Sequence, residues 1–113
     1  MDLGIQNKVA LVTAASRGLG FAVAERLSKE GAVVAICGRS KARIVEAAKN
    51  LQIATGGTIE PFEADVTDHP AVHEMVQEIK KRHGAIDILV CNAGGPPPGM
   101  HHEFTIDDYR AAF

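Results

Sequence analysis

The order of the apolar segments is the feature that most constrains the fold of this chain. Short apolar runs alternate with longer segments in which apolar residues recur three and four positions apart, as on one face of a helix. The short runs are expected to be buried strands, at residues 8–13, 33–37, 58–64 and 87–91. Strands that alternate with helices form a parallel sheet with right-handed crossovers. The sequence therefore predicts an α/β fold with helices on both faces of the sheet.

The ends of the helices are marked by capping residues. Ser40 and Asp68 are placed to cap the second and third helices, and glycines close all three, at Gly31, Gly56 and Gly84. The residues expected on the buried faces are Leu19, Val23, Ala24 and Leu27, then Ile44, Ala48 and Leu51, then Val72, Met75, Val76 and Ile79. Pro61 has no backbone N–H to donate to a neighbouring strand, so the third strand is predicted at a sheet edge.

Composition narrows the class of protein further. The chain has 113 residues, 46% of them hydrophobic, and a formal net charge of -2. These values predict one domain over residues 1–113 and exclude a strongly basic surface for nucleic acid. Neither a signal peptide nor a membrane-spanning run is found, so a cytoplasmic protein is expected. Cys37 and Cys91 both fall in predicted strands and are expected to be buried thiols.

A glycine-rich turn joins the first predicted strand to the first predicted helix. It reads Thr13-Ala14-Ala15-Ser16-Arg17-Gly18-Leu19-Gly20 and resembles the T-G-x-x-x-G-x-G turn of the short-chain dehydrogenase/reductases. Between a strand and a helix, the backbone N–H groups of such a turn can face a pyrophosphate. Gly18 would let the chain approach the phosphates, and Gly20 would let helix and strand pack closely. The resemblance implies a Rossmann-type sheet in the order 3-2-1-4, with the turn at the cofactor.

One position departs from the family pattern, because Ala14 stands where the family has its first glycine. A methyl group there costs about 1 kcal/mol if the backbone needs positive φ, and much less otherwise. The sequence leaves these two cases open.

The end of the second strand indicates which dinucleotide is preferred. NAD-binding domains place an acidic residue there to accept from the ribose hydroxyls, whereas this chain has Arg39 and Ser40. A guanidinium pairs with a 2′-phosphate, and Arg17 in the glycine turn could reach the same group. The expected cofactor is therefore NADP (NADPH).

Two further motifs support the resemblance. Asp65-Val66 follows the third strand, where the family holds the adenine ring, and Asn92-Ala93-Gly94 matches the family's N-A-G motif after the fourth strand. Each alone is also typical of a helix cap or a turn. The cofactor-binding residues predicted from all these motifs are Thr13, Ala14, Ser16, Arg17, Gly18, Leu19, Gly20, Arg39, Ser40, Asp65, Val66, Asn92, Ala93 and Gly94.

The resemblance implies hydride transfer to a small carbonyl compound, or from an alcohol, by a Tyr-x-x-x-Lys motif. The only tyrosine here, Tyr109, has Phe113 four positions later, and no catalytic residue is assigned. His101 and His102 lack a third ligand and predict no metal site. The sequence thus predicts a Rossmann domain truncated after its fourth strand. Two functions are compatible with such a domain. It is either one part of an NADP-dependent reductase, inactive by itself, or a non-catalytic nucleotide-binding or interaction module. Self-association through the edge strand at 87–91 is also expected.

Overall fold

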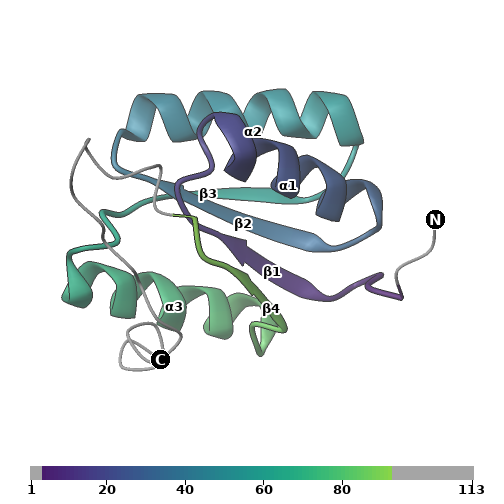
Figure 1. The fold of residues 1–113 in the computed structure, drawn as a ribbon. Helices are drawn as coiled ribbons and strands as arrows, with labels where there is room; N and C mark the ends of the chain where they lie inside the picture. The colour runs from purple at the N-terminus through teal and green to yellow at the C-terminus, as the bar shows by residue number, and fades with distance from the viewer. Residues whose placement is uncertain (1–3, 93–113) are drawn as a thin grey trace.

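A four-stranded parallel sheet forms the centre of the molecule. The computed structural model describes residues 4–92. The sequence also leads us to expect a Gly/Pro-rich loop after Asn92, up to Glu103, and a further helix that begins at Thr105; both lie outside the described residues. The strand order is β3-β2-β1-β4, as predicted (Figure 1). In chain order the elements are β1 (Val9–Val12), α1 (Gly18–Lys29), β2 (Val33–Gly38), α2 (Lys41–Thr55), β3 (Ile59–Glu63), α3 (His69–His83) and β4 (Ile88–Val90).

Helices cover both faces of the sheet, with α1 and α2 on one face and α3 on the other (Figure 1). Successive residues of a strand point to opposite faces, so β1 contributes to both cores. Val12 packs toward α1 and α2, whereas Leu11 packs toward α3, and both are fully buried. This arrangement confirms the predicted α/β class and explains why the inner strands are apolar on both sides.

The helix ends follow the predicted caps. Ser40 Oγ accepts from the Arg43 N–H at 3.3 Å, and Asp68 Oδ1 accepts from the Ala71 N–H at 3.2 Å. Gly56 ends α2 in the left-handed region, with φ of 69°. These local signals mark the starts of α2 and α3 and the end of α2, and therefore where the connecting turns lie.

Two burial predictions were wrong. Leu19 was expected on the buried face of α1, but it is 73% exposed, and the buried positions are Gly20, Ala24 and Ser28. Small residues bring α1 close to the sheet, which turns the larger Leu19 outward. Cys91 was expected to be buried and is exposed, because β4 ends at Val90 and the chain leaves the sheet there.

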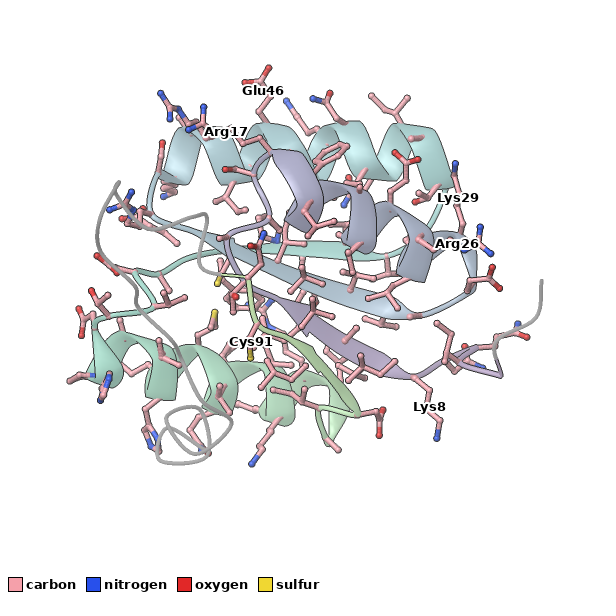
Figure 2. All side chains as sticks on the ribbon, in the orientation of Figure 1. Lys8, Arg17, Arg26, Lys29, Glu46 and Cys91 are labelled. Carbon is pink, nitrogen blue, oxygen red and sulfur yellow. The ribbon has the colours of Figure 1, made fainter. Side chains whose placement is uncertain are left out.

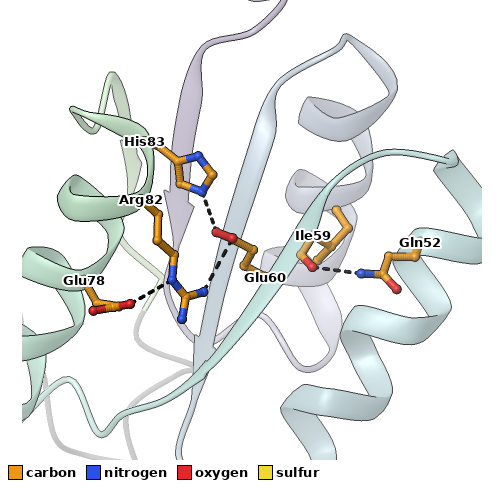
Figure 3. A network of polar contacts seen from close by, with 6 residues as sticks. All are labelled: Gln52, Ile59, Glu60, Glu78, Arg82 and His83. Atoms are coloured by element: carbon orange, nitrogen blue, oxygen red, sulfur yellow. Dashed lines mark hydrogen bonds and ion pairs between the residues drawn. The ribbon is translucent and has the colours of Figure 1, made fainter.

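Polar contacts join β3, a strand at the edge of the sheet, to the end of α3 (Figure 3). His83 Nε2 lies 2.7 Å from Glu60 Oε2, and Arg82 forms ion pairs with Glu60 at 3.5 Å and Glu78 at 2.9 Å. Pro61 sits in this strand at the sheet edge, as predicted. Backbone bonds to β2 pass through Thr58 and Ala64, so by the two-residue period the missing donor of Pro61 faces outward.

Within residues 4–92, no helix is long and apolar enough to cross a membrane.

Candidate cofactor-binding site

The turn between β1 and α1 lies at the carboxyl end of the sheet. Its backbone enters the left-handed region twice, at Ala14 with φ of 49° and at Gly18 with φ of 67°. The open question about Ala14 is therefore answered: its backbone does take positive φ, at a cost of about 1 kcal/mol relative to glycine. The Ala15 N–H donates to the Cys37 carbonyl at 3.1 Å, which ties the turn to the end of β2.

The two glycines of the turn serve different purposes. A Cβ at Gly20 would lie 2.6 Å from the Ala14 carbonyl oxygen and 2.8 Å from Asn92 Nδ2, so no side chain fits. A Cβ at Gly18 would meet nothing within 4 Å, and only its positive φ favours glycine. The space beside Gly18 is open, whereas the space beside Gly20 is filled by the protein itself.

Thr13 and Asn92 join the ends of β1 and β4. Thr13 is fully buried, and its Oγ1 accepts from the Asn92 N–H at 2.8 Å and donates to the Asn92 carbonyl at 2.8 Å. Asn92 Nδ2 also reaches the Ala14 carbonyl, at 3.4 Å. The first residue of the predicted N-A-G motif is thus bonded to the glycine turn, while Ala93 and Gly94 lie outside the described residues.

The N-terminus of α1 differs from those of the other two helices. Ser40 and Asp68 cap α2 and α3 with side-chain oxygens, but Arg17 at the start of α1 makes no such bond. The first N–H groups of a helix have no partners inside it and carry partial positive charge. Within residues 4–92 those of α1 have no side-chain cap, so they are available to an anion at the carboxyl end of the sheet.

Three arginines lie at this end of the sheet without forming ion pairs to the described residues. Arg26 pairs with Glu30 at 3.0 Å, and Arg82 pairs with Glu60 and Glu78. Arg17, Arg39 and Arg43, all exposed, form no ion pair within the described part of the chain. Arg17 and Arg39 are the arginines predicted from the sequence.

Arg43 was missed by the sequence analysis. It lies in the first turn of α2, and its spacing from Ala47 and Asn50 places all three on one side of the helix. Helical spacing from the Ser40 cap was the only signal that could have found it.

A hollow of about 140 Å³ lies between the glycine turn and α2. It is lined by Ser16, Arg17, Arg43, Glu46, Ala47 and Asn50. A larger, shallower depression of about 630 Å³ runs along the outside of α2. That depression is formed by one helix alone and includes no residue of the glycine turn, so the smaller hollow belongs to the candidate site.

Asp65 lies at the carboxyl end of β3, beside the buried Ala64. Its Oδ1 accepts from the Thr67 hydroxyl at 2.7 Å and from the Thr67 N–H at 2.9 Å. These two bonds, and more weakly the charge of Arg39, lower the pKa of the Asp65 carboxyl, so it is ionised at neutral pH. Val66 packs against the core on the α3 side. Asp65 and Arg39 therefore present opposite charges along the same edge.

Cys37 lies beneath the turn as part of the core. Burial raises the pKa of its thiol to about 11, and the nearby Ala14 N–H opposes this shift only weakly. The thiol is neutral at physiological pH and packs as a small apolar group. In residues 4–92 no group of three His, Cys, Asp or Glu side chains is arranged to hold a metal ion.

The glycine turn, the uncapped helix and the sheet order together define a Rossmann-type α/β domain. The family model described as short chain dehydrogenase matches residues 8–113. The chain therefore belongs to the short-chain dehydrogenase family.

Individual relatives agree with this assignment. The 2,3-dihydro-2,3-dihydroxybenzoate dehydrogenase of Bacillus subtilis is 36% identical over 97% of this chain and 42% of its own length. A short-chain dehydrogenase/reductase homolog of the same organism is 37% identical, with 97% of this chain and 96% of that protein covered. The crystal structure of L-sorbose reductase from Gluconobacter frateurii with NADPH and L-sorbose matches with a TM-score of 0.82 and 33% identity, over 99% of this chain and 43% of that one. The chain thus spans less than half the length of the Bacillus subtilis dehydrogenase and of L-sorbose reductase.

Proposed function

We propose that this chain forms the NADP(H)-binding part of a short-chain dehydrogenase/reductase. The observation that carries the proposal is the gathering of Arg17, Arg39 and Arg43, which form no ion pair among residues 4–92, beside the uncapped start of α1. Cations that are not held in ion pairs and open helix N–H groups are what a ligand with several phosphates needs. The similar L-sorbose reductase was crystallised with NADPH, which supports the same choice.

Each residue of the site has a part in this proposal. The N–H groups at the start of α1 bind the pyrophosphate, which approaches over the open space beside Gly18. Arg39 and Arg17 bind the 2′-phosphate, and the Ser40 hydroxyl, already an acceptor for the α2 cap, can donate to the same group. Thr67 bonds to Oδ1 of Asp65, so Oδ2 is available to accept from the adenine amine. Asn92 is fixed beside the glycine turn by its hydrogen bond to Thr13.

The reaction we propose for the complete site is hydride transfer between the nicotinamide and a small carbonyl compound or secondary alcohol. NADPH, when bound, supplies the hydride. This sequence offers no Tyr-x-x-x-Lys proton donor, since Tyr109 is followed by Phe113 at the fourth position. We therefore assign cofactor binding to this chain and expect no carbonyl-dependent NADPH oxidation by it alone. The alternative is a non-catalytic nucleotide-binding role. Measurable NADPH oxidation by this chain alone would contradict both proposals.

Fluorescence titration with NADPH and NADH tests the cofactor assignment. We expect NADPH to bind at least tenfold more tightly than NADH, because one charge-assisted hydrogen bond contributes about 1.5 to 3 kcal/mol. Arg39→Ala should remove most of this preference. Arg26→Ala is the matched control, because it removes the same charge from an arginine that is paired on α1 and lies away from the site (Figure 2). Equal, weak binding of both nucleotides would refute the proposal.

We also propose that β4 associates with a further strand. It is the outer strand on its side of the described sheet, and Ile88, Leu89 and Val90 are only half buried. No proline interrupts it, in contrast to β3. Light scattering should detect self-association of this chain at micromolar concentration, and Leu89→Lys should weaken it. A stable monomer would contradict this.

A further inference from the structure

We propose that the outer face of α2 packs in antiparallel orientation against α2 of a second copy of this chain. The contact is formed by four exposed residues of the helix, which are Ala42, Glu46, Lys49 and Ile53. We call these four residues the α2 stripe. The inference goes beyond nucleotide binding, and it concerns a different element from the edge strand β4.

The α2 stripe lies on the side of the helix that does not face the sheet. The opposite side of α2 is buried in the core through Ile44, Ala47, Ala48 and Leu51. In Figure 2, Glu46 points away from the sheet. Members of the stripe follow one another by four, three and four positions, which is the spacing of the contact positions in a two-stranded coiled coil. A second helix can therefore pack along the whole stripe.

Exposed apolar side chains and a shallow depression mark the same face. The depression of about 630 Å³ is lined by the whole α2 stripe and by Val45, Asn50 and Gln52. Ile53 is 85% exposed and Val45 is 38% exposed. Apart from Leu19, these are the large hydrophobic side chains that are exposed within residues 4–92. A partner that covers them removes apolar surface from water, which favours association.

The charges of the stripe indicate that the partner is a second copy of the chain. Neither Glu46 nor Lys49 forms an ion pair with any residue in the range 4–92. A two-fold axis through the middle of the stripe places Glu46 opposite the partner's Lys49, and Lys49 opposite the partner's Glu46. At each end, the small Ala42 then lies opposite the large Ile53 of the partner subunit. The stripe is thus complementary to itself in charge and in size.

The same charges select the antiparallel orientation. In a parallel pair in register, Glu46 would lie opposite the partner's Glu46, and Lys49 opposite the partner's Lys49. Like charges at such a contact repel one another, whereas the antiparallel pair has two attractive contacts. Polar residues at contact positions of paired helices fix orientation and lower affinity.

The length of α2 limits the strength of this contact. The helix has 15 residues, so it is about 22 Å long. One pair of such helices buries less than the roughly 800 Å² per partner that is usual for a stable interface. We therefore expect a weak, reversible dimer that forms at concentrations approaching the millimolar range.

Sedimentation equilibrium of charge-reversed variants tests the pairing, in the parent chain and in a Leu89→Lys background that weakens association through β4. Circular dichroism first verifies that each variant is folded. Glu46→Lys and Lys49→Glu each create two contacts between like charges, so each should weaken dimerisation roughly tenfold or more, with a smaller effect at high salt. The double variant Glu46→Lys/Lys49→Glu restores unlike charges at both contacts. Its dissociation constant should return to within roughly threefold of the parent value.

A mixture of the two single variants gives a sharper test. One chain then has two lysines in its stripe and the other has two glutamates, so a mixed dimer has only attractive contacts. Native mass spectrometry with one variant labelled with ¹⁵N should detect the mixed dimer in excess of either homodimer. The matched controls are Glu74→Lys and Lys81→Glu, which reverse the same charges at exposed positions of α3, on the other face of the sheet. Neither control should alter the dissociation constant.

The outcomes separate this inference from the association proposed for β4. Dimerisation that Leu89→Lys abolishes and the charge reversals leave unchanged would mean that β4 alone forms the contact, and the inference would be wrong. A double variant that stays as weak as the single variants, or a mixture without excess mixed dimer, would show that Glu46 and Lys49 do not face each other across the contact. A chain that is monomeric at millimolar concentration would overturn the inference and leave the α2 stripe to a different partner.

Discussion

The amino and carboxyl ends of the parallel sheet differ in how their polar groups are paired. At the amino end, where strands begin and helices finish, polar groups are paired within the chain. Asp87 Oδ2 accepts from the Val9 N–H at 2.9 Å, Ser28 Oγ donates to Thr55 Oγ1 at 2.8 Å, and Glu60 contacts His83 and Arg82. At the carboxyl end, the described residues include two strained or glycine-dependent turn positions, an uncapped helix and arginines without ion pairs.

We expect this difference to separate residues that stabilise the fold from residues that bind the ligand. A substitution at the amino end removes a bond that exists without ligand, so it should lower the free energy of unfolding and leave nucleotide affinity unchanged. A substitution of an unpaired arginine at the carboxyl end should do the reverse. The following changes test where this division holds.

Gly20→Ala should have the largest effect, because Gly20 belongs to the carboxyl end and yet is packed like a core residue. A Cβ there meets the Ala14 carbonyl and Asn92, so helix and turn must move apart, at a cost of about 3 kcal/mol in unfolding free energy. Urea unfolding measures the loss. Gly18→Ala is the control and should cost about 1 kcal/mol, since only its positive φ is unfavourable. Equal losses in the two variants would show that the close approach at Gly20 is not important.

Asp87→Ala should destabilise the amino end by about 2 kcal/mol, because the N–H of the buried Val9 loses its acceptor. Asp87→Asn keeps an oxygen acceptor and should recover most of the loss. Urea unfolding gives the stability, and NADPH titration of the folded variants should give an affinity equal to that of the parent. A weaker NADPH affinity in Asp87→Ala would break the separation between the two ends.

The Cys37 thiol predicts a loss of stability in alkaline solution. Its folded pKa of about 11 lies above the ordinary thiol value of 9.0, so the folded state holds the proton more tightly than the unfolded state. Its contribution is fully present below pH 9 and is lost as the pH rises to about 11, by roughly 1 to 3 kcal/mol. Urea unfolding from pH 8 to 11 measures the slope. Cys37→Ala should flatten it, and an unchanged slope would show that the thiol is already ionised or exposed.

Ala14→Gly should have the smallest effect and the opposite sign. Glycine adopts a φ of 49° without the steric cost that alanine bears, although it also gives the unfolded chain more freedom. We expect a net gain of about 0.5 kcal/mol in unfolding free energy, visible as a small rise in Tm. A decrease would mean that the Ala14 backbone is less strained than its φ indicates.

The order of elements could be predicted from sequence because it depends on local patterns. Apolar runs, the Ser40 and Asp68 caps and Pro61 each specify their own segment, and the sheet order followed from the family resemblance. On α1 the prediction was right for Ala24, which is buried, and wrong for Leu19. Gly20 and Ser28 are buried beside Ala24 and were not predicted, since they carry little hydrophobic signal. Close packing selects small residues there, and periodicity gives more weight to Leu19.

Residues of the candidate site could be predicted where a sequence motif contains them. Residues that reach the site only through the packing of the helices could not. Arg17 and Arg39 follow from their places beside the glycine turn and the second strand. Arg43 and Glu46 reach the same hollow only because α2 packs beside α1, and no spacing along the sequence relates them to Ser16. The positive φ of Ala14 likewise depends on how the turn is closed by the Cys37 carbonyl.

The uncapped start of α1 has a consequence for the lifetime of the protein. A ligand that binds only the folded state stabilises it by about 2.7 kcal/mol when its concentration is a hundred times Kd. Because the helix has no side-chain cap, the nucleotide would act as its cap, and the helix start should open more often without it. Proteases cut open segments first, so bound nucleotide should slow proteolysis at the start of α1.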